Sequence, residues 1–175
     1  MKTKYLLLGL VIVFAMAFSN TATAQTNREI GVRILANGGS DMIFKKEKNP
    51  NRFKRFRAGI SNLGYIENNG SDAFVFGAGI GFGKEKRKNI EENLHFITGW
   101  EIQAGILSFD SNSNGQVGLG FILGFQYDVG DNLAVVAETI PNISTNFGDG
   151  FDSSFNINAG INGTAAIGLI YRFQK

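Results

Sequence analysis

The feature that most limits the fold of this chain is a repeated alternation of bulky apolar residues with small or polar ones. In QVGLGFILGFQYDVG, residues 116–130, every second position from Val117 to Val129 is apolar or aromatic, and the positions between are glycine or polar apart from Ile122. The same period of two recurs at 74–83, 96–106 and 165–173. Because successive side chains of a β-strand point to opposite faces, this period predicts strands and not helices.

Counting the alternating segments predicts eight strands. They lie at about 28–36, 40–47, 53–64, 73–84, 94–109, 116–129, 132–141 and 155–173. The segments between them are rich in Asn, Gly and Ser, which suit tight turns. The Asn162-Gly163 pair leaves open whether the last strand is continuous. It also stays open whether residues 28–47 form two membrane strands or one irregular strand.

The glycine-rich face of these strands indicates which side meets lipid. A soluble barrel buries its bulky face and covers the other with solvated polar side chains, whereas glycine is a poor cover for an exposed strand face. Glycine suits the crowded interior of a narrow closed barrel, with the apolar face turned outward to lipid. The sequence therefore predicts an all-β fold, a transmembrane up-and-down antiparallel β-barrel of eight strands.

The N-terminus has the three parts of a secretory signal peptide. Lys2 and Lys4 precede an apolar run from Tyr5 to Phe18, and small or polar residues follow up to Ala24. The run is shorter than a membrane-spanning helix requires, so we expect cleavage before Gln25. The predicted organisation is a signal peptide at 1–24 and a barrel domain at 25–175, exported to the outer membrane.

Charge and cysteine content narrow the classes of function. Two of the 17 Lys and Arg residues lie in the signal peptide, so the remainder balances the 15 Asp and Glu residues. A neutral domain offers no basis for nucleic-acid binding. The chain contains no cysteine and one histidine, so neither a lipid-anchored lipoprotein nor a Cys/His metal site is indicated.

The inward-facing positions of the predicted strands collect charged residues. Buried charges are unfavourable unless they are paired, so we expect arginines to pair with carboxylates inside the barrel. The predicted luminal network contains Arg33, Arg55, Arg57, Glu101, Asp128, Glu138 and Arg172. An eight-stranded barrel has little room beyond its side chains, which favours a plug over a narrow ion path.

Aromatic residues and the C-terminus suggest a family. Trp100, Tyr127, Tyr171 and Phe173 fit the aromatic girdles at membrane interfaces. The ending YRFQK is similar to the terminal aromatic signal by which the assembly machinery recognises outer-membrane barrels, although Gln174 and Lys175 follow the aromatic residue. With its signal peptide and eight alternating segments, the chain resembles the small eight-stranded outer-membrane barrels of Gram-negative bacteria.

This resemblance implies an orientation. Both termini would face the periplasm, and the connections near 37–40, 65–72, 110–115 and 142–154 would face the cell exterior. We expect Phe147 and Phe151 in the last of these loops to contact a partner or lipopolysaccharide. The other connections carry Lys45, Lys46, Lys48, Arg52, Lys84, Lys86, Arg87 and Lys88. These are either ordinary solvated turns or contacts to anionic headgroups.

No catalytic residue, cofactor or metal site is indicated. There is no G-x-S-x-G motif, and His95 is predicted at the periplasmic end, far from outer-leaflet lipid A. We expect a non-enzymatic, monomeric barrel with a structural or surface-interaction role through its extracellular loops. Outer-membrane lipid, lipopolysaccharide and the assembly machinery are the expected partners. The alternatives are a narrow pore for ions or small solutes, a membrane-embedded lipid hydrolase and a secreted soluble binding barrel.

Overall fold

The computed structural model describes residues 27–68, 71–109, 112–148, 154–158 and 165–173. The predicted signal peptide, and Phe151 of the predicted loop, lie outside these residues. No helix within the described ranges has the length and apolar character needed to cross a bilayer.

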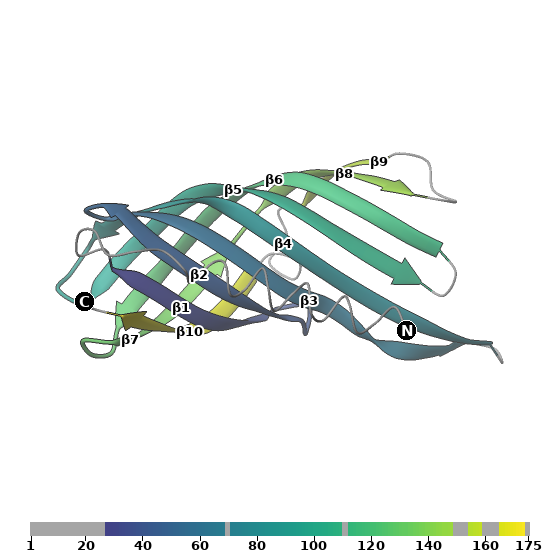
Figure 1. The fold of residues 1–175 in the computed structure, drawn as a ribbon, viewed down its shortest axis with the longest axis horizontal. Coiled ribbons are helices and arrows are strands. Elements are labelled where there is room, and N and C mark those ends of the chain that lie inside the picture. The colour runs from purple at the N-terminus through teal and green to yellow at the C-terminus, as the bar shows by residue number, and fades with distance from the viewer. Residues whose placement is uncertain (1–26, 69–70, 110–111, 149–153, 159–164, 174–175) are drawn as a thin grey trace, which may run out of the picture.

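Every regular element in this part of the chain is a β-strand, and the strands form one antiparallel sheet (Figure 1). The elements are β1 (Arg28–Leu35), β2 (Ser40–Asn49), β3 (Arg52–Asn68), β4 (Ser71–Asn89), β5 (Leu94–Phe109), β6 (Asn112–Asp128), β7 (Leu133–Thr139), β8 (Asn142–Gly148), β9 (Ser154–Asn158) and β10 (Ala165–Phe173). Residues 28–47 thus form most of two strands, β1 and β2, which resolves the alternative left open by the sequence.

The sheet closes on itself as a barrel. Strands β1 to β6 pair in chain order, β6 pairs with β7, β7 with β10, and β10 with β1. Following directly paired residues around the wall from Tyr127 leads back to β6 at Val117, ten residues away. A stagger of this size tilts eight strands by about 40° to the barrel axis. The predicted all-β barrel of eight strand positions is confirmed.

Two of these eight positions are occupied by pairs of shorter strands. β7 pairs with residues 123–128 of β6, and β8 pairs with residues 114–120 of the same strand. The break between β7 and β8 lies at Ile140 and Pro141, because proline cannot donate a hydrogen bond to the ladder. β9 pairs with β8, while β10 pairs with β7. The prediction of a loop over 142–154 was wrong for 142–148, which continue the seventh strand, and the predicted strand at 155–173 is two strands.

Two basic residues that were assigned to connections lie within strands: Lys45, which the predicted strand at 40–47 already contained, and Arg87, because β4 extends further than predicted. Lys45 and Arg87 were expected in solvated connections, but Lys45 lies in β2, Arg87 lies in β4, and both are buried. The alternation of the strands simply continues through them, so they occupy inward positions. The turns themselves are short, at 50–51, 90–93 and 129–132, and lie at the end of the barrel that carries the C-terminus (Figure 1).

The core of the molecule lies inside the barrel. Ile97, Ile122, Val136 and Ile170 form a buried apolar cluster with Ala134 and Ile140. Inward glycines make room for this packing and for the charged side chains beside it. A Cβ atom at Gly81 would lie 2.8 Å from Arg57 Nε and 2.9 Å from Glu101 Oε1. The outward positions alternate with these and are exposed and apolar along most strands.

Candidate functional site

The most distinctive feature of the interior is a ring of ion pairs contributed by five strands. Arg33 from β1 contacts Asp41 from β2 and Glu138 from β7. Arg55 Nη2 lies 2.7 Å from Glu138 Oε1, and Arg55 Nε lies 3.3 Å from Glu101 Oε2 on β5. Arg57 Nε donates to Glu101 Oε1 at 2.6 Å, and its Nη1 lies 3.5 Å from Asp41 Oδ2, which completes the ring.

A second group of ion pairs continues from this ring toward the turns. Glu85 from β4 joins the two, because its Oε2 lies 3.3 Å from Arg55 Nη1 and 2.7 Å from Lys45 Nζ. Arg87 donates to Glu85 Oε1 at 2.8 Å and to Glu29 Oε2 at 2.5 Å. Its guanidinium also lies 3.8 Å from the centre of the Phe53 ring.

The network ends beside the C-terminal strand. Arg172 from β10 donates to Glu29 Oε1 at 3.1 Å and to Asp128 Oδ1 at 2.9 Å. Asp128 also lies within 3.0 Å of His95 Nε2, and the other ring nitrogen of His95 is 2.9 Å from Asn89 Oδ1. Both ring nitrogens of this histidine therefore lie within hydrogen-bonding distance of a side-chain oxygen.

The structure places all seven residues of the predicted luminal network inside the barrel and joins them through the contacts above. Arg33, Arg55, Glu101 and Glu138 are fully buried or nearly so, while Arg57, Asp128 and Arg172 are partly exposed. Sequence reasoning missed five further members: Glu29, Asp41, Lys45, Glu85 and Arg87. Glu29, Asp41 and Lys45 already lay at inward positions of the predicted strands, so parity alone would have identified them. Glu85 and Arg87 follow the predicted strand at 73–84, and extending that strand would have placed them inward as well.

The charges of this network balance. Its six cations are Arg33, Lys45, Arg55, Arg57, Arg87 and Arg172, and its six carboxylates are Glu29, Asp41, Glu85, Glu101, Asp128 and Glu138. Ionised groups taken out of water are tolerated when each has a partner of opposite charge and good hydrogen bonds. Together with the apolar cluster, these paired side chains occupy the interior of the barrel in the half nearer the C-terminal strand.

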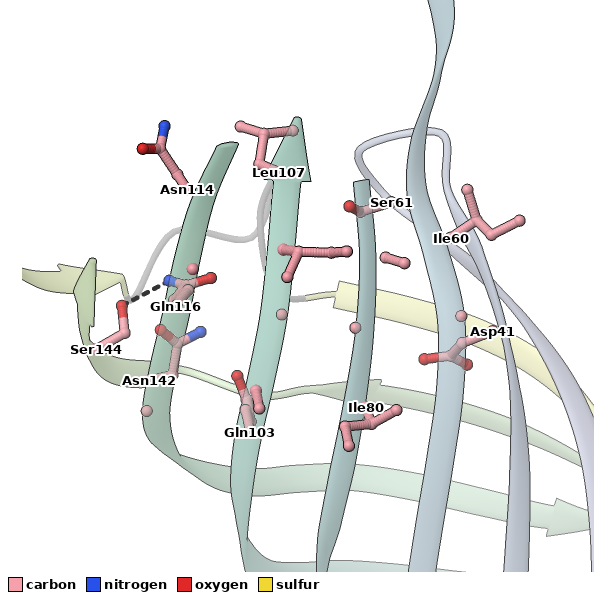
Figure 2. A pocket seen from close by; sticks show the side chains of 18 of the residues that line it. Asp41, Ile60, Ser61, Ile80, Gln103, Leu107, Asn114, Gln116, Asn142 and Ser144 are labelled. Atoms are coloured by element: carbon pink, nitrogen blue, oxygen red, sulfur yellow. Dashed lines mark hydrogen bonds between the residues drawn. The ribbon is translucent and has the colours of Figure 1, made fainter. Parts of the chain in front are cut away.

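On the side of the network away from the C-terminal strand end, here called above, the barrel contains a cavity of about 360 Å³. Asp41, Arg57 and Gln103 line its lower part, and the upper walls carry amide and hydroxyl side chains. Figure 2 shows Gln116, Asn142 and Ser144 on one side, with Gln116 Nε2 donating to Ser144 Oγ at 2.7 Å, and Asp41 and Ile60 on the opposite side. The cavity is thus a polar vestibule closed below by the ion-pair ring.

The predicted interface aromatics all lie on the outer surface. Trp100, Tyr127, Tyr171 and Phe173 are between 40% and 52% exposed, so their rings face the surroundings of the barrel and not its interior. The Tyr171 and Phe173 rings pack edge to face, with centroids 5.0 Å apart. Phe147, which was expected in a loop, lies on β8 and is also exposed on the outside. Among the described residues, no cluster of His, Cys, Asp and Glu is suited to a metal ion.

Comparison with known proteins gives the fold a context. No family model and no curated protein matches the sequence. Among solved structures, the chain is similar to a major outer membrane protein from Thermus thermophilus, with a TM-score of 0.59 and 12% identity over 86% of this chain and 100% of that one.

Two further structures have the same architecture. Neisserial surface protein A matches with a TM-score of 0.51 and 14% identity, over 85% of this chain and 95% of that one. Ail, the attachment invasion locus protein of Yersinia pestis, in complex with the heparin analogue sucrose octasulfate, matches with a TM-score of 0.50 and 15% identity, over 87% of this chain and 100% of that one. The chain therefore has the fold of the small eight-stranded outer-membrane β-barrels.

Proposed function

We propose that this chain is a non-enzymatic outer-membrane barrel that acts at the cell surface, through the end of the barrel opposite its C-terminus. The observation that carries this proposal is the contrast between the two halves of the interior. The half near the C-terminus is filled by the neutral ion-pair network, whereas the other half holds an open polar vestibule. A barrel whose lumen is filled by paired side chains is suited to contacting a partner at its outer end and not to passing solutes.

The β8–β9 hairpin is the part of this end most suited to contact a partner. Phe147, Phe155 and Ile157 are exposed on it, the last two at 70% and 72%. Figure 1 shows both strands toward the end of the barrel away from the C-terminus. We propose lipopolysaccharide of the outer leaflet as its partner, because exposed apolar side chains next to amide-rich walls match a molecule with acyl chains and sugars.

Topology is the first point to test, and the absence of native cysteine makes the test direct. Asn37→Cys lies in the β1–β2 turn at the proposed outer end, and Asn93→Cys lies in the β4–β5 turn at the other end. In intact cells, a membrane-impermeant maleimide should label the first variant only, and both after permeabilisation. Labelling of Asn93→Cys alone in intact cells would overturn the orientation.

The interaction itself is tested with purified lipopolysaccharide. The folded protein and a Phe147→Ser/Phe155→Ser variant are titrated in the same detergent, and the variant should bind more weakly. Val135→Ser, an exposed change on β7 in the other half of the barrel, serves as the control. Equal binding by all three proteins would reject the hairpin as the contact surface.

The pore and hydrolase alternatives are separated from this proposal by two measurements. Reconstitution in planar bilayers should give no discrete conductance steps, because the ion-pair network occupies the lumen. Purified protein incubated with outer-membrane lipid should release no fatty acid, because His95 lies near the start of β5, beside the turn at 90–93 and away from the proposed outer end of the barrel. Discrete conductance would favour the pore, and lipid release would favour the hydrolase.

Monomer and assembly are further parts of the proposal. The ladder between β1 and β10 is complete, so the half of the wall that contains it needs no partner strand, which supports a monomeric barrel. Phe173 is exposed at the end of β10, where the assembly machinery can reach it.

A further inference from the structure

The outer surface of the first four strands carries a row of directly opposed cations. Arg28 on β1 is paired with Lys46 on β2, Lys46 with Lys54 on β3, and Lys54 with Lys84 on β4. The row is flanked by aromatic rings, because Arg28 is paired with Phe173 and Lys84 with Trp100. Lys84 Nζ lies 5.6 Å from the centre of the Trp100 ring.

A second row lies closer to the turns. Arg52 is paired with Lys86, and both are exposed, as are Lys48 and Lys88. We call these eight residues the basic face: Arg28, Lys46, Lys48, Arg52, Lys54, Lys84, Lys86 and Lys88. Of the 17 Lys and Arg residues in the chain, two lie in the predicted signal peptide and six in the luminal network. The basic face therefore holds eight of the other nine.

No carboxylate compensates this charge on the described outer surface of the same half of β1–β4. Glu29 and Glu85 are buried inside the barrel with arginine partners. Glu47 accepts hydrogen bonds from Asn27 Nδ2 at 2.6 Å and from the Asn51 backbone at 3.2 Å. Like charges placed directly opposite one another on neighbouring strands repel, so an anion bound on this surface would relieve the repulsion.

The position of the basic face indicates what kind of anion this is. Two residues further along β2, β3 and β4, away from the turns, the outward residues are Phe44, Phe56 and Phe82. They belong to the apolar outer surface of the barrel. Because the strands are tilted, directly paired residues on successive strands lie at different heights along the barrel axis. Lys84, at one end of the row, lies beside Trp100 on the outer surface. An anion that fits here must tolerate apolar surroundings on one side, as a phospholipid headgroup does.

A groove of about 310 Å³ lies on this face, lined by Lys48, Arg52, Lys54, Lys84, Lys86 and Trp100 among others. Glu85 also lines it, but its carboxylate is paired with Lys45 and Arg87. We propose that it binds the phosphate of an anionic phospholipid in the leaflet at the C-terminal end of the barrel, with Trp100 packing beside the glycerol and upper acyl chain. The inference rests on the proposed membrane location. Each lysine or arginine near an anionic membrane surface favours binding by a factor of roughly five, so several together select strongly for anionic over zwitterionic lipid.

The chain contains a built-in reporter, because Trp100 is its only tryptophan. The folded protein is reconstituted in phosphatidylcholine vesicles that contain a small, equal fraction of brominated phosphatidylglycerol or brominated phosphatidylcholine. Bromine quenches tryptophan fluorescence at short range. Phosphatidylglycerol should quench Trp100 several-fold more strongly than phosphatidylcholine in the native protein.

Two matched variants assign the preference to charge at the groove. In Lys54→Gln/Lys84→Gln/Lys86→Gln the two lipids should quench equally, whereas Lys54→Arg/Lys84→Arg/Lys86→Arg should keep the preference. A gel shift between unheated and heated samples shows that each variant is folded. A preference that survives in the glutamine variant would overturn the proposal.

The remaining outcomes separate this inference from the proposed function. Equal quenching of the native protein by both lipids means that the barrel is in the membrane but lacks the lipid site. No quenching by either lipid means that the membrane location is wrong as well. If inorganic phosphate added to the vesicles abolishes the preference at matched ionic strength, the groove binds a soluble anion and the assignment to lipid fails.

Discussion

Replacing Glu101 by glutamine is the sharpest test of the idea that paired charges hold the barrel together. Glu101 is fully buried, accepts from Arg57 Nε at 2.6 Å and from Gln103 Nε2 at 3.0 Å, and lies 3.3 Å from Arg55 Nε. Glutamine preserves the shape but removes the negative charge, so the luminal network changes from neutral to a net charge of +1. Arg57 then keeps only Asp41 as a carboxylate partner, at 3.5 Å.

The expected loss follows from what remains around the two arginines. Removing one partner of a buried ion pair typically costs about 3–5 kcal/mol, and Arg55 retains Glu85 and Glu138. We therefore expect Glu101→Gln to lower the free energy of unfolding by about 3 kcal/mol. With a slope of about 2 kcal/mol per molar urea, the unfolding midpoint should fall by about 1.5 M.

The assay is urea unfolding in detergent micelles or lipid vesicles, followed by tryptophan fluorescence and by the gel shift between unheated and heated samples. Glu92→Gln, an exposed change in the β4–β5 turn, is the matched control and should leave the midpoint unchanged. Adding Arg57→Gln to Glu101→Gln restores charge balance and should recover a large part of the loss. The reasoning is refuted if Glu101→Gln unfolds at the same urea concentration as Glu92→Gln.

Three further predictions concern packing, assembly and processing. Gly83→Ala should lower stability by about 1–3 kcal/mol, because the new Cβ would lie 2.6 Å from a side-chain atom of the opposite strand, whereas Gly130→Ala meets nothing within 4 Å and should be neutral; urea unfolding distinguishes them. Phe173→Ala removes the edge-to-face contact with Tyr171 and the terminal aromatic, and should slow insertion in cells, measured by pulse-labelling and the heat-dependent gel shift. Mass spectrometry of the protein extracted from outer membranes should show an N-terminus at Gln25; an intact N-terminus would reject the predicted cleavage.

Much of the wall could be predicted because it depends on local alternation. Each strand of a closed barrel has one crowded face and one exposed face, so glycine and charge at every second position identify the interior without reference to any other strand. This is how Arg33, Arg55 and Glu138 were placed inward. Lys45 was assigned to a connection although it lay within the predicted strand at 40–47, because clustered charges are typical of turns. Arg87 was missed because the predicted strand at 73–84 ended before it.

The two split strands could not be predicted for a different reason. Pro141 indicated a strand end, and Asn142 to Gly148 reads as a polar loop. The segment nevertheless continues the seventh strand, because residues 114–120 of the long strand β6 are not paired with β7. β8 forms the backbone hydrogen bonds of that edge. Local sequence carries no information on a hydrogen-bonding edge provided by residues that are distant along the chain.

The sequence by itself determined the alternation of faces, the number of strand positions and the charges available to the interior, because these depend only on residue type and spacing. Only the tertiary structure decided which charges meet. The ten-residue stagger around the closed wall brings Arg55 on β3 to Glu138 on β7 and lines up Arg28, Lys46, Lys54 and Lys84 on the outside. That stagger is a property of closure, which requires the register of all strands at once, and no single segment of the chain encodes it.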